Sequence, residues 1–140
     1  MQAQDCVQVY EIEQIAFPST TWTLEDFQNS LLSKDQLYFV AHNADRIVGF
    51  AALYTMIDSA DLVNIAVHPD FRRQGVADNL METLLAKADS LYIDTVTLEV
   101  RIHNVAAIHL YEKYNFHKIA VRKAYYQNPP EDAGIMQRSK

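Results

Sequence analysis

The segment from Val67 to Ala77 combines residue types and a spacing that suit the binding of a phosphate group. A predicted strand ends just before Pro69, and a predicted helix starts at Gly75. Free N–H groups in the first turn of a helix attract anions, and small residues there let the backbone approach closely. Arg72 and Arg73 add fixed positive charge for phosphate oxygens. The alternative is an ordinary loop with solvated arginines, and the spacing alone does not decide between the two.

Glu99 and Tyr111 are the candidates for moving protons. Glu99 lies near the end of a predicted strand, on the face opposite Leu98 and Val100. A carboxylate in that place is either a solvated surface charge or a general base. Tyr111 follows Asn104 by about two helical turns, so both point along one face of a predicted helix. A tyrosine there is either a core residue or an acid, and Asn104 is expected to cap the helix.

Other chemistries have no pattern that supports them. None of the five histidines has another histidine four residues along, so we expect no metal site. The sequence has no Gly-x-Ser-x-Gly motif and no cysteine–histidine pair that would indicate a nucleophile. Cys6 is the only cysteine, which excludes an internal disulfide and is typical of a reducing compartment.

Length and composition indicate one globular domain, residues 1–140, in the cytoplasm. Hydrophobic residues make up 49% and charged residues 21% of the chain, which excludes a disordered protein. The net charge of −6 (12 − 18) disfavours a DNA-binding or RNA-binding role. The longest apolar stretch, 47–57, is too short for a membrane span, which takes about 20 residues.

The elements that must position these groups indicate an α+β fold around one central mixed sheet, in which antiparallel strands precede a β-α-β unit. Asp5 is expected to cap the first helix, and Thr23 with Asp26 forms a capping box for the second, whose Leu31 and Leu32 turn inward. Helices are predicted over 5–16, from 23, over 75–91 and over 104–114. Strands are predicted over 36–42, 47–56, 61–67, 93–100, 116–126 and 132–137.

The signature Arg72-x-x-Gly75-x-Ala77 resembles the Q/R-x-x-G-x-G/A motif of the GCN5-related N-acetyltransferase (GNAT) family. Further segments resemble, in order, its bacterial RimI-type branch, which acetylates the N-terminal alanine of a small-subunit ribosomal protein. These segments are Asn64–Gly75, Leu98–Arg101, Asn104–Phe116, Arg122–Tyr126 and Glu131–Ala133. The resemblance extends from residue 5 to residue 137 and is densest from 62 to 126.

The resemblance implies a GNAT-like sheet with helices on both faces, and acetyl-CoA as cosubstrate. It implies Glu99 as the general base, usually acting through water, and Tyr111 as the acid for the leaving thiolate. It places Trp22, Tyr125 and Tyr126 near the acceptor, with ordinary strand packing as the alternative for the two tyrosines. The residues implied to bind acetyl-CoA are Ile65, Ala66, Val67, Arg72, Arg73, Gln74, Gly75, Val76, Ala77, Asp78 and Asn104.

The sequence also departs from the family pattern. Asp78 stands where a basic residue is common, Asn115 replaces a glycine, and the few residues before Asp5 leave the family's first strand shortened or absent.

The expected acceptor is a protein N-terminus, in particular the N-terminal alanine of a ribosomal protein. The alternatives are an enzyme for a small amine or a lysine, and a CoA-binding module that has lost catalysis. We expect a monomer or a weak dimer, with no DNA or membrane partner.

Overall fold

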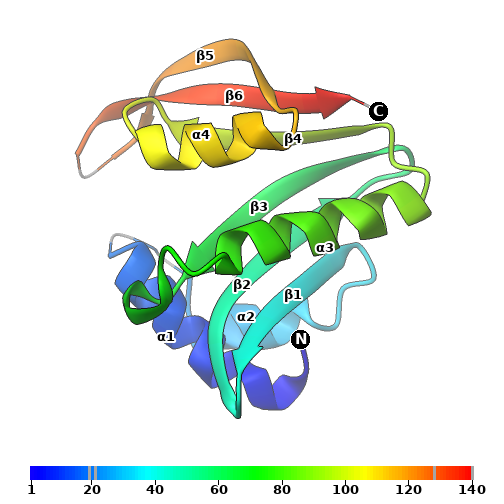
Figure 1. Ribbon diagram of the computed structural model, residues 1–140, viewed down its shortest axis with the longest axis vertical. Coiled ribbons are helices and arrows are strands. Elements are labelled where there is room, and N and C mark those ends of the chain that lie inside the picture. The colour runs from blue at the N-terminus through cyan, green and yellow to red at the C-terminus, as the bar shows by residue number, and fades with distance from the viewer. Residues whose placement is uncertain (19, 21, 128, 140) are drawn as a thin grey trace.

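The computed structural model describes residues 1–18, 20, 22–127 and 129–139 (Figure 1). Ser19, Thr21 and Asn128, which belong to predicted loops, lie outside the described residues. The helices are α1 (Cys6–Ala16), α2 (Leu24–Ser30), α3 (Val76–Ser90) and α4 (Val105–Lys113), with 3₁₀ turns η1 (Ala3–Asp5) and η2 (Pro69–Phe71). The strands are β1 (Gln36–Asn43), β2 (Arg46–Thr55), β3 (Ser59–Val67), β4 (Thr95–Arg101), β5 (His117–Tyr126) and β6 (Glu131–Ser139). In the described ranges, no helix combines the length and the apolar character needed to cross a membrane.

The strands form one mixed sheet in the order β1-β2-β3-β4-β6-β5. Neighbouring strands are antiparallel except β3 and β4, which are parallel and are connected through α3. The predicted fold class is therefore confirmed. The position of β6 between β4 and β5 was not predicted, because residue alternation marks a strand but does not select its neighbours.

Two apolar cores lie on opposite faces of the sheet, which confirms that helices cover both faces. Under α1 and α2, Val9, Ile12 and Phe27 pack against β2 residues such as Phe50. The other core lies under α3 and α4 and includes Leu80, Leu84, Val96, Leu98, Tyr111 and Phe116. The carboxylate of Glu13 in α1 is buried and accepts hydrogen bonds from the side-chain amide of Asn64 at 2.8 and 2.9 Å.

Of two predictions about the N-terminal helices, one is confirmed in position only and one is wrong. Asp5 is the N-cap residue of α1, but its side chain makes no capping bond to α1, because its Oδ2 accepts from the N–H of Gln2 (2.8 Å) and so closes η1. Leu32 is 83% exposed, since α2 ends at Ser30 and the chain turns before the leucine reaches the core. The capping box of α2 is confirmed by reciprocal bonds between Thr23 and Asp26 of 3.1 and 2.8 Å.

The sheet separates into two halves between β3 and β4. These strands pair only over Ser59–Asp61 with Thr95–Thr97, although β3 continues to Val67 and β4 to Arg101. Figure 1 shows the two strands diverging, with α3 beside the β1–β3 half and α4 beside the other half. Among the described residues, the later part of β3 has no strand partner on its β4 side.

Gly49 of β2 lets the start of α3 come close to the sheet. A Cβ at this position would lie 2.9 Å from Cγ1 of Val76 and 3.1 Å from the carbonyl oxygen of Ala66. Val76 is the first residue of α3. Any side chain at position 49 would therefore push the start of α3 outward.

β1 and β5 are the two edges of the sheet. β5 is exposed along almost its whole length, carries Lys118, Arg122 and Lys123, and has two irregularities in its register with β6. The β1 sequence has no lysine, arginine, acidic residue or proline, and most of the strand is half-buried. At one point on this edge, the ammonium group of Met1 donates to the carbonyl oxygen of Tyr38 (3.3 Å).

Candidate active site

A sharp turn between β3 and α3 leaves the first amides of the helix open to a ligand. After η2 the backbone takes positive φ angles at Arg73 (62°) and Gly75 (81°). Gly75 is the N-cap of α3, and without a side chain it cannot cap the helix amides. The N–H groups of Val76, Ala77 and Asp78 therefore point out of the helix end, as an anion site requires.

This turn borders a cavity of about 120 Å³. The lining residues come from the end of β3, the turn and the start of α3, namely Val67, Phe71, Arg72, Arg73, Gly75, Val76, Ala77 and Asp78. Both arginines are exposed. Gln74 is not among the lining residues, and its side-chain amide donates to the carbonyl oxygen of Asp70 (3.4 Å). The structure thus brings the predicted phosphate-binding residues together, apart from Gln74.

Glu99 lies near side chains from β5, on the far side of β6, and from the neighbouring strand β3. Its Oε1 lies 3.6 Å from Nη1 of Arg122, and the Glu99 side chain is 34% exposed. Arg122 stacks in turn on Tyr125, 5.0 Å from the ring centroid. Interaction with the Glu99 carboxylate, followed by burial, raises the pKa of Tyr125. Asp61 on β3 makes the last pair with β4, at Thr97, so Glu99 lies two residues beyond the point where the strands diverge. Burial, followed by the charge of Glu99, raises the pKa of Asp61.

Tyr126 lies within electrostatic range of both Glu99 and Tyr111. Burial and the charge of Glu99 raise the pKa of Tyr126 to about 12. Burial, with a smaller contribution from Tyr126, raises the pKa of Tyr111 well above its ordinary value. Tyr111 is 7% exposed, and its ring centroid lies 6.0 Å from that of Phe116. Both phenols are protonated at neutral pH, so each can donate a hydrogen bond to a ligand.

Asn104 caps α4 as predicted, since its side chain accepts from the N–H of Ala107 at 3.2 Å. Asn115 has a φ of 69°, which confirms the expected left-handed position after the helix. The implied acetyl-CoA contacts Ile65, Ala66 and Val67 lie on the part of β3 beyond its last pair with β4.

Trp22 occupies a different environment from Glu99. Its ring centroid is 5.0 Å from that of Phe27, and it packs on the core under α1 and α2. No contact among the described residues joins Trp22 to Glu99, so its role near the acceptor stays a prediction.

Asp78 borders the cavity but is not a free negative charge. Its Oδ1 accepts from Nζ of Lys113 (2.6 Å) and from the hydroxyl of Tyr114 (2.8 Å). These two bonds lower the pKa of Asp78. The departure from the family pattern at this position is therefore compensated by a cation from α4.

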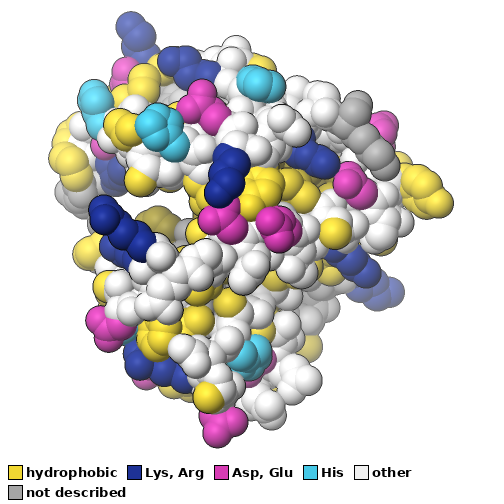
Figure 2. Space-filling view, viewed as in Figure 1, with side chains coloured by type: hydrophobic (Ala, Val, Ile, Leu, Met, Phe, Trp, Pro, Cys, Tyr) yellow, Lys and Arg dark blue, Asp and Glu magenta, His cyan; other side chains and the backbone are white. Residues whose placement is uncertain are grey.

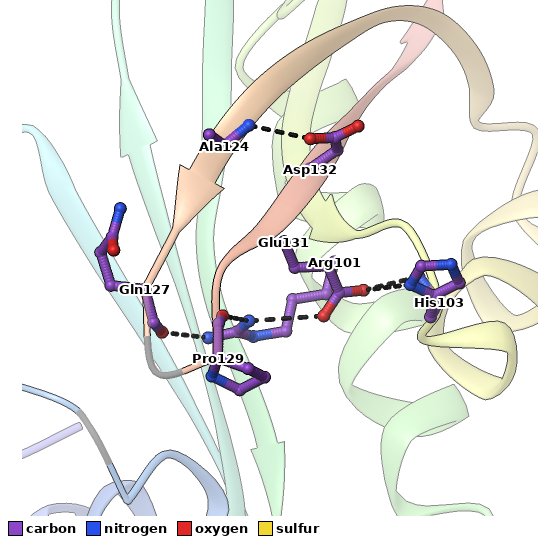
Figure 3. A network of polar contacts seen from close by, with 7 residues as sticks. All are labelled: Arg101, His103, Ala124, Gln127, Pro129, Glu131 and Asp132. Atoms are coloured by element: carbon purple, nitrogen blue, oxygen red, sulfur yellow. Dashed lines mark hydrogen bonds and ion pairs between the residues drawn. The ribbon is translucent and has the colours of Figure 1, made fainter.

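Arg101 is a residue of the site that the sequence analysis did not single out (Figure 3). Its guanidinium donates to the carbonyl oxygens of Gln127 (2.9 Å) and Pro129 (3.0 Å) and to Oε1 of Glu131 (3.4 Å). It also lies 4.5 Å from the ring centroid of Tyr126. Arg101 therefore fixes the β5–β6 turn and Tyr126 to the end of β4. The available signal was its position two residues after Glu99 in the same strand.

Glu131 extends this network to the loop before α4 (Figure 3). Its Oε2 accepts from the backbone N–H of His103 (2.8 Å) and lies 3.1 Å from Nδ1 of the same residue. These bonds, the backbone one first, and the interaction with Arg101 lower the pKa of Glu131. A lowered carboxylate pKa stabilises the folded state above the ordinary pKa of glutamate, and this contribution is lost as the pH falls through the lowered value.

Arg101→Lys is expected to lower the free energy of unfolding by about 1–3 kcal/mol, because lysine cannot bridge two carbonyls and stack on a ring at once. Urea denaturation measures this loss. The matched control is Arg122→Lys, whose side chain is 58% exposed. A pair of that kind contributes about 0–1 kcal/mol. Equal losses in the two variants would contradict the anchoring role of Arg101.

Comparisons with known proteins agree with this geometry. Residues 6–116 match the model of the Acetyltransferase (GNAT) family. The chain is 36% identical to the ribosomal protein bS18-alanine N-acetyltransferase of Escherichia coli (strain K12), over 97% of this chain and 92% of that one. The crystal structure of the Escherichia coli ribosomal-protein-S18-alanine N-acetyltransferase superposes with a TM-score of 0.90 and 35% identity, covering 99% of this chain and 90% of the other. A GNAT acetyltransferase from Elizabethkingia anophelis with acetyl-CoA bound shares the fold, with a TM-score of 0.76 and 22% identity, over 94% and 90% of the two chains.

Proposed function

Because this chain belongs to the acetyltransferase (GNAT) family and transfers an acetyl group from acetyl-CoA to an amine, we propose that its acceptor is the N-terminal alanine of a ribosomal protein. The observation that carries the proposal is that Glu99 follows, by two residues, the last pair of β4 with β3, while the turn at Arg72–Ala77, called the phosphate turn below, follows the end of β3. Relatives with this named activity are similar to almost the whole chain.

The phosphate turn would hold the pyrophosphate of acetyl-CoA. The amides at the start of α3 supply hydrogen-bond donors, and Arg72 and Arg73 supply charge. The backbone of Ile65–Val67, which pairs with β2 but has no strand partner on its β4 side, would accept and donate bonds along the rest of the cosubstrate. These contacts would lead the thioester toward the side of the sheet where Glu99 lies.

The transfer forms a bond between the amine nitrogen and the carbonyl carbon and breaks the carbon–sulfur bond. Glu99 would take the proton released by the amine, directly or through water. An α-amine with a pKa near 7.8 is about 10–15% neutral at pH 7, so a carboxylate base is sufficient.

Tyr111 would donate a hydrogen bond to the departing sulfur. With ordinary pKa values, full proton transfer from a phenol to a thiolate is uphill by about 2 kcal/mol. Burial raises the pKa of Tyr111 and so increases that cost. We therefore assign Tyr111 the stabilisation of the thiolate by a hydrogen bond, with the final proton supplied through solvent.

A peptide with a free N-terminal alanine followed by a basic residue is expected to be acetylated far faster than the same peptide with a blocked N-terminus and a free lysine. The two amines differ by about 2.6 pKa units, or roughly 3.5 kcal/mol of deprotonation cost. The net charge of −6 adds an attraction for cationic peptides that salt screens. Mass spectrometry of the acetylated positions, at low and high salt, measures the preference.

The N-blocked peptide is also the control for chemistry at the lysine. Equal acetylation of the two peptides, or acetylation of lysine alone, would contradict an N-terminal acceptor and favour a lysine or small-amine enzyme. Binding of acetyl-CoA without transfer to any amine would favour the non-catalytic module. We further propose that residues 1–140 form one domain that acts in the cytoplasm. We also propose that the protein is a monomer or a weak dimer, and size-exclusion chromatography tests this oligomeric state.

A further inference from the structure

Lys113 and Asp78 link the end of α4 to the start of α3. Lys113 Nζ lies 2.6 Å from Asp78 Oδ1, and the two side chains are 62% and 34% exposed. The hydroxyl of Tyr114, the residue after α4, donates to the same oxygen at 2.8 Å and lies 3.4 Å from Oε1 of Glu82. Figure 2 shows apolar side chains in the hollow between α3 and α4, and a basic side chain that meets acidic ones there.

This contact joins elements that belong to different halves of the sheet. α3 packs against β1, β2 and β3, while α4 lies beside the other half (Figure 1). Among the polar contacts of the described residues, α3 reaches the second half at two places. One is this cluster at its start, and the other is Asp89, which pairs with Arg138 of β6 at 3.4 Å near its end. The cluster is the link next to the site.

Each helix carries one end of the site. The amides of the phosphate turn belong to the first turn of α3, where Asp78 also lies. Tyr111 belongs to the last turn of α4, two residues before Lys113 and three before Tyr114. A shift of α4 relative to α3 would therefore change the distance between the phosphate turn and the Tyr111 hydroxyl.

We propose that Asp78, Lys113 and Tyr114 form a strut that sets the distance between the phosphate turn and Tyr111, and are positioning residues of the acetyl transfer. This inference rests on the proposed function, because acetyl-CoA held at the phosphate turn must place its sulfur atom beside the Tyr111 hydroxyl. A misplacement of about 1 Å at a reacting centre can reduce a rate roughly 100-fold. The strut acts through Tyr111 and need not touch the substrate.

The competing interpretation treats Asp78 only as a charge beside the phosphates. Under that interpretation, Asp78→Ala removes a repulsion, so the KM for acetyl-CoA falls and kcat stays the same. With a strut, Asp78→Ala lowers kcat by roughly 10-fold to 100-fold, whatever happens to KM. Lys113→Ala is expected to lower kcat similarly and to raise the KM for acetyl-CoA, since Asp78 then keeps only the Tyr114 hydroxyl as a partner and its charge beside the phosphates is no longer neutralised.

The decisive variant is the exchange Asp78→Lys with Lys113→Asp. The combined length of the two side chains is unchanged, so the ion pair can form in the opposite direction. The Tyr114 hydroxyl loses Asp78 as an acceptor in this variant but keeps Oε1 of Glu82. We expect kcat to return to within about threefold of the wild type, as complementary charges restore the contact. Lys87→Ala is the matched control, because it removes an exposed lysine from the far end of α3. It should leave kcat unchanged.

Amide hydrogen exchange of α4 gives a readout that does not require turnover. In both alanine variants, the amides of α4 should exchange about 10-fold faster than in the wild type, while those in the centre of α3 keep their protection. The exchanged pair should restore the wild-type rates. Unchanged α4 protection, or a swap with kcat no higher than the single variants, would overturn the strut. If the wild type transfers no acetyl group while the alanine variants still show faster exchange of the α4 amides, the proposed function is contradicted and the strut is not.

Discussion

Replacing Gly75 with glutamate is expected to abolish acetyl-CoA binding in a protein that still folds. A Cβ at position 75 would meet no atom within 4 Å, so a side chain has room there. The new carboxylate would lie beside the free amides at the start of α3. Two like charges 4 Å apart repel by about 4 kcal/mol at an effective dielectric constant of 20. Calorimetry should therefore show an affinity loss of roughly three orders of magnitude.

Gly75→Ala separates this charge effect from backbone strain. Gly75 has a φ of 81°, and a left-handed conformation costs any other residue about 1–2 kcal/mol. Alanine carries that cost without the charge, so both variants should lose similar thermal stability while alanine keeps acetyl-CoA affinity within about tenfold. If the two variants bind acetyl-CoA equally well, the turn does not hold the pyrophosphate.

Glu99→Gln is expected to reduce the acetylation rate at pH 7 by about 10²–10³, the usual contribution of a general base. Glutamine keeps the size of the side chain and can still accept a hydrogen bond, but it cannot take the proton of the amine. The deficit should become smaller as the pH rises through the pKa of the acceptor amine, because the amine then loses its proton unaided. Initial rates from pH 6 to pH 9 measure both effects.

Glu112→Gln provides the control for a general charge effect. Glu112 is an exposed residue of α4. Replacing it with glutamine removes one carboxylate from the surface, so the variant has the same net charge as Glu99→Gln. Its rate should match the wild type at every pH. A Glu99→Gln variant with wild-type activity across this range would make Glu99 a solvated strand residue, which is the alternative that the sequence left open.

The sequence predicts most of the elements of this fold because their signals are local. Alternation in 95–101 and helical spacing in 76–90 depend on neighbouring residues only, and both elements form close to the predicted bounds. The insertion of β6 between β4 and β5 depends on pairing between distant segments, which no local pattern encodes. The error at Leu32 has a local origin, since the helical pattern continued past the actual end of α2.

The residues of the site also differ in whether their signals are local or depend on distant segments. The grouping of the two arginines, the glycine and the alanine around one cavity could be predicted, because these residues lie within six positions of the chain. Arg101 and Lys113 could not be assigned from spacing, because their partners lie 26 to 35 residues away. Asp78 shows the consequence: as a single letter it is an unfavourable charge, whereas in the fold Lys113 and Tyr114 compensate it.

The unequal edges of the sheet determine how the molecule would self-associate at high concentration. A foreign strand that approached β5 would meet lysine and arginine side chains and a broken hydrogen-bond register, which are common defences against aggregation. β1 carries no proline and no lysine, arginine or acidic side chain, and the Met1 ammonium group bonds to this edge at Tyr38. β1 is therefore the edge at which we expect intermolecular sheet growth to start. We therefore expect aggregation during expression and storage to start at β1, the edge of the sheet opposite β5.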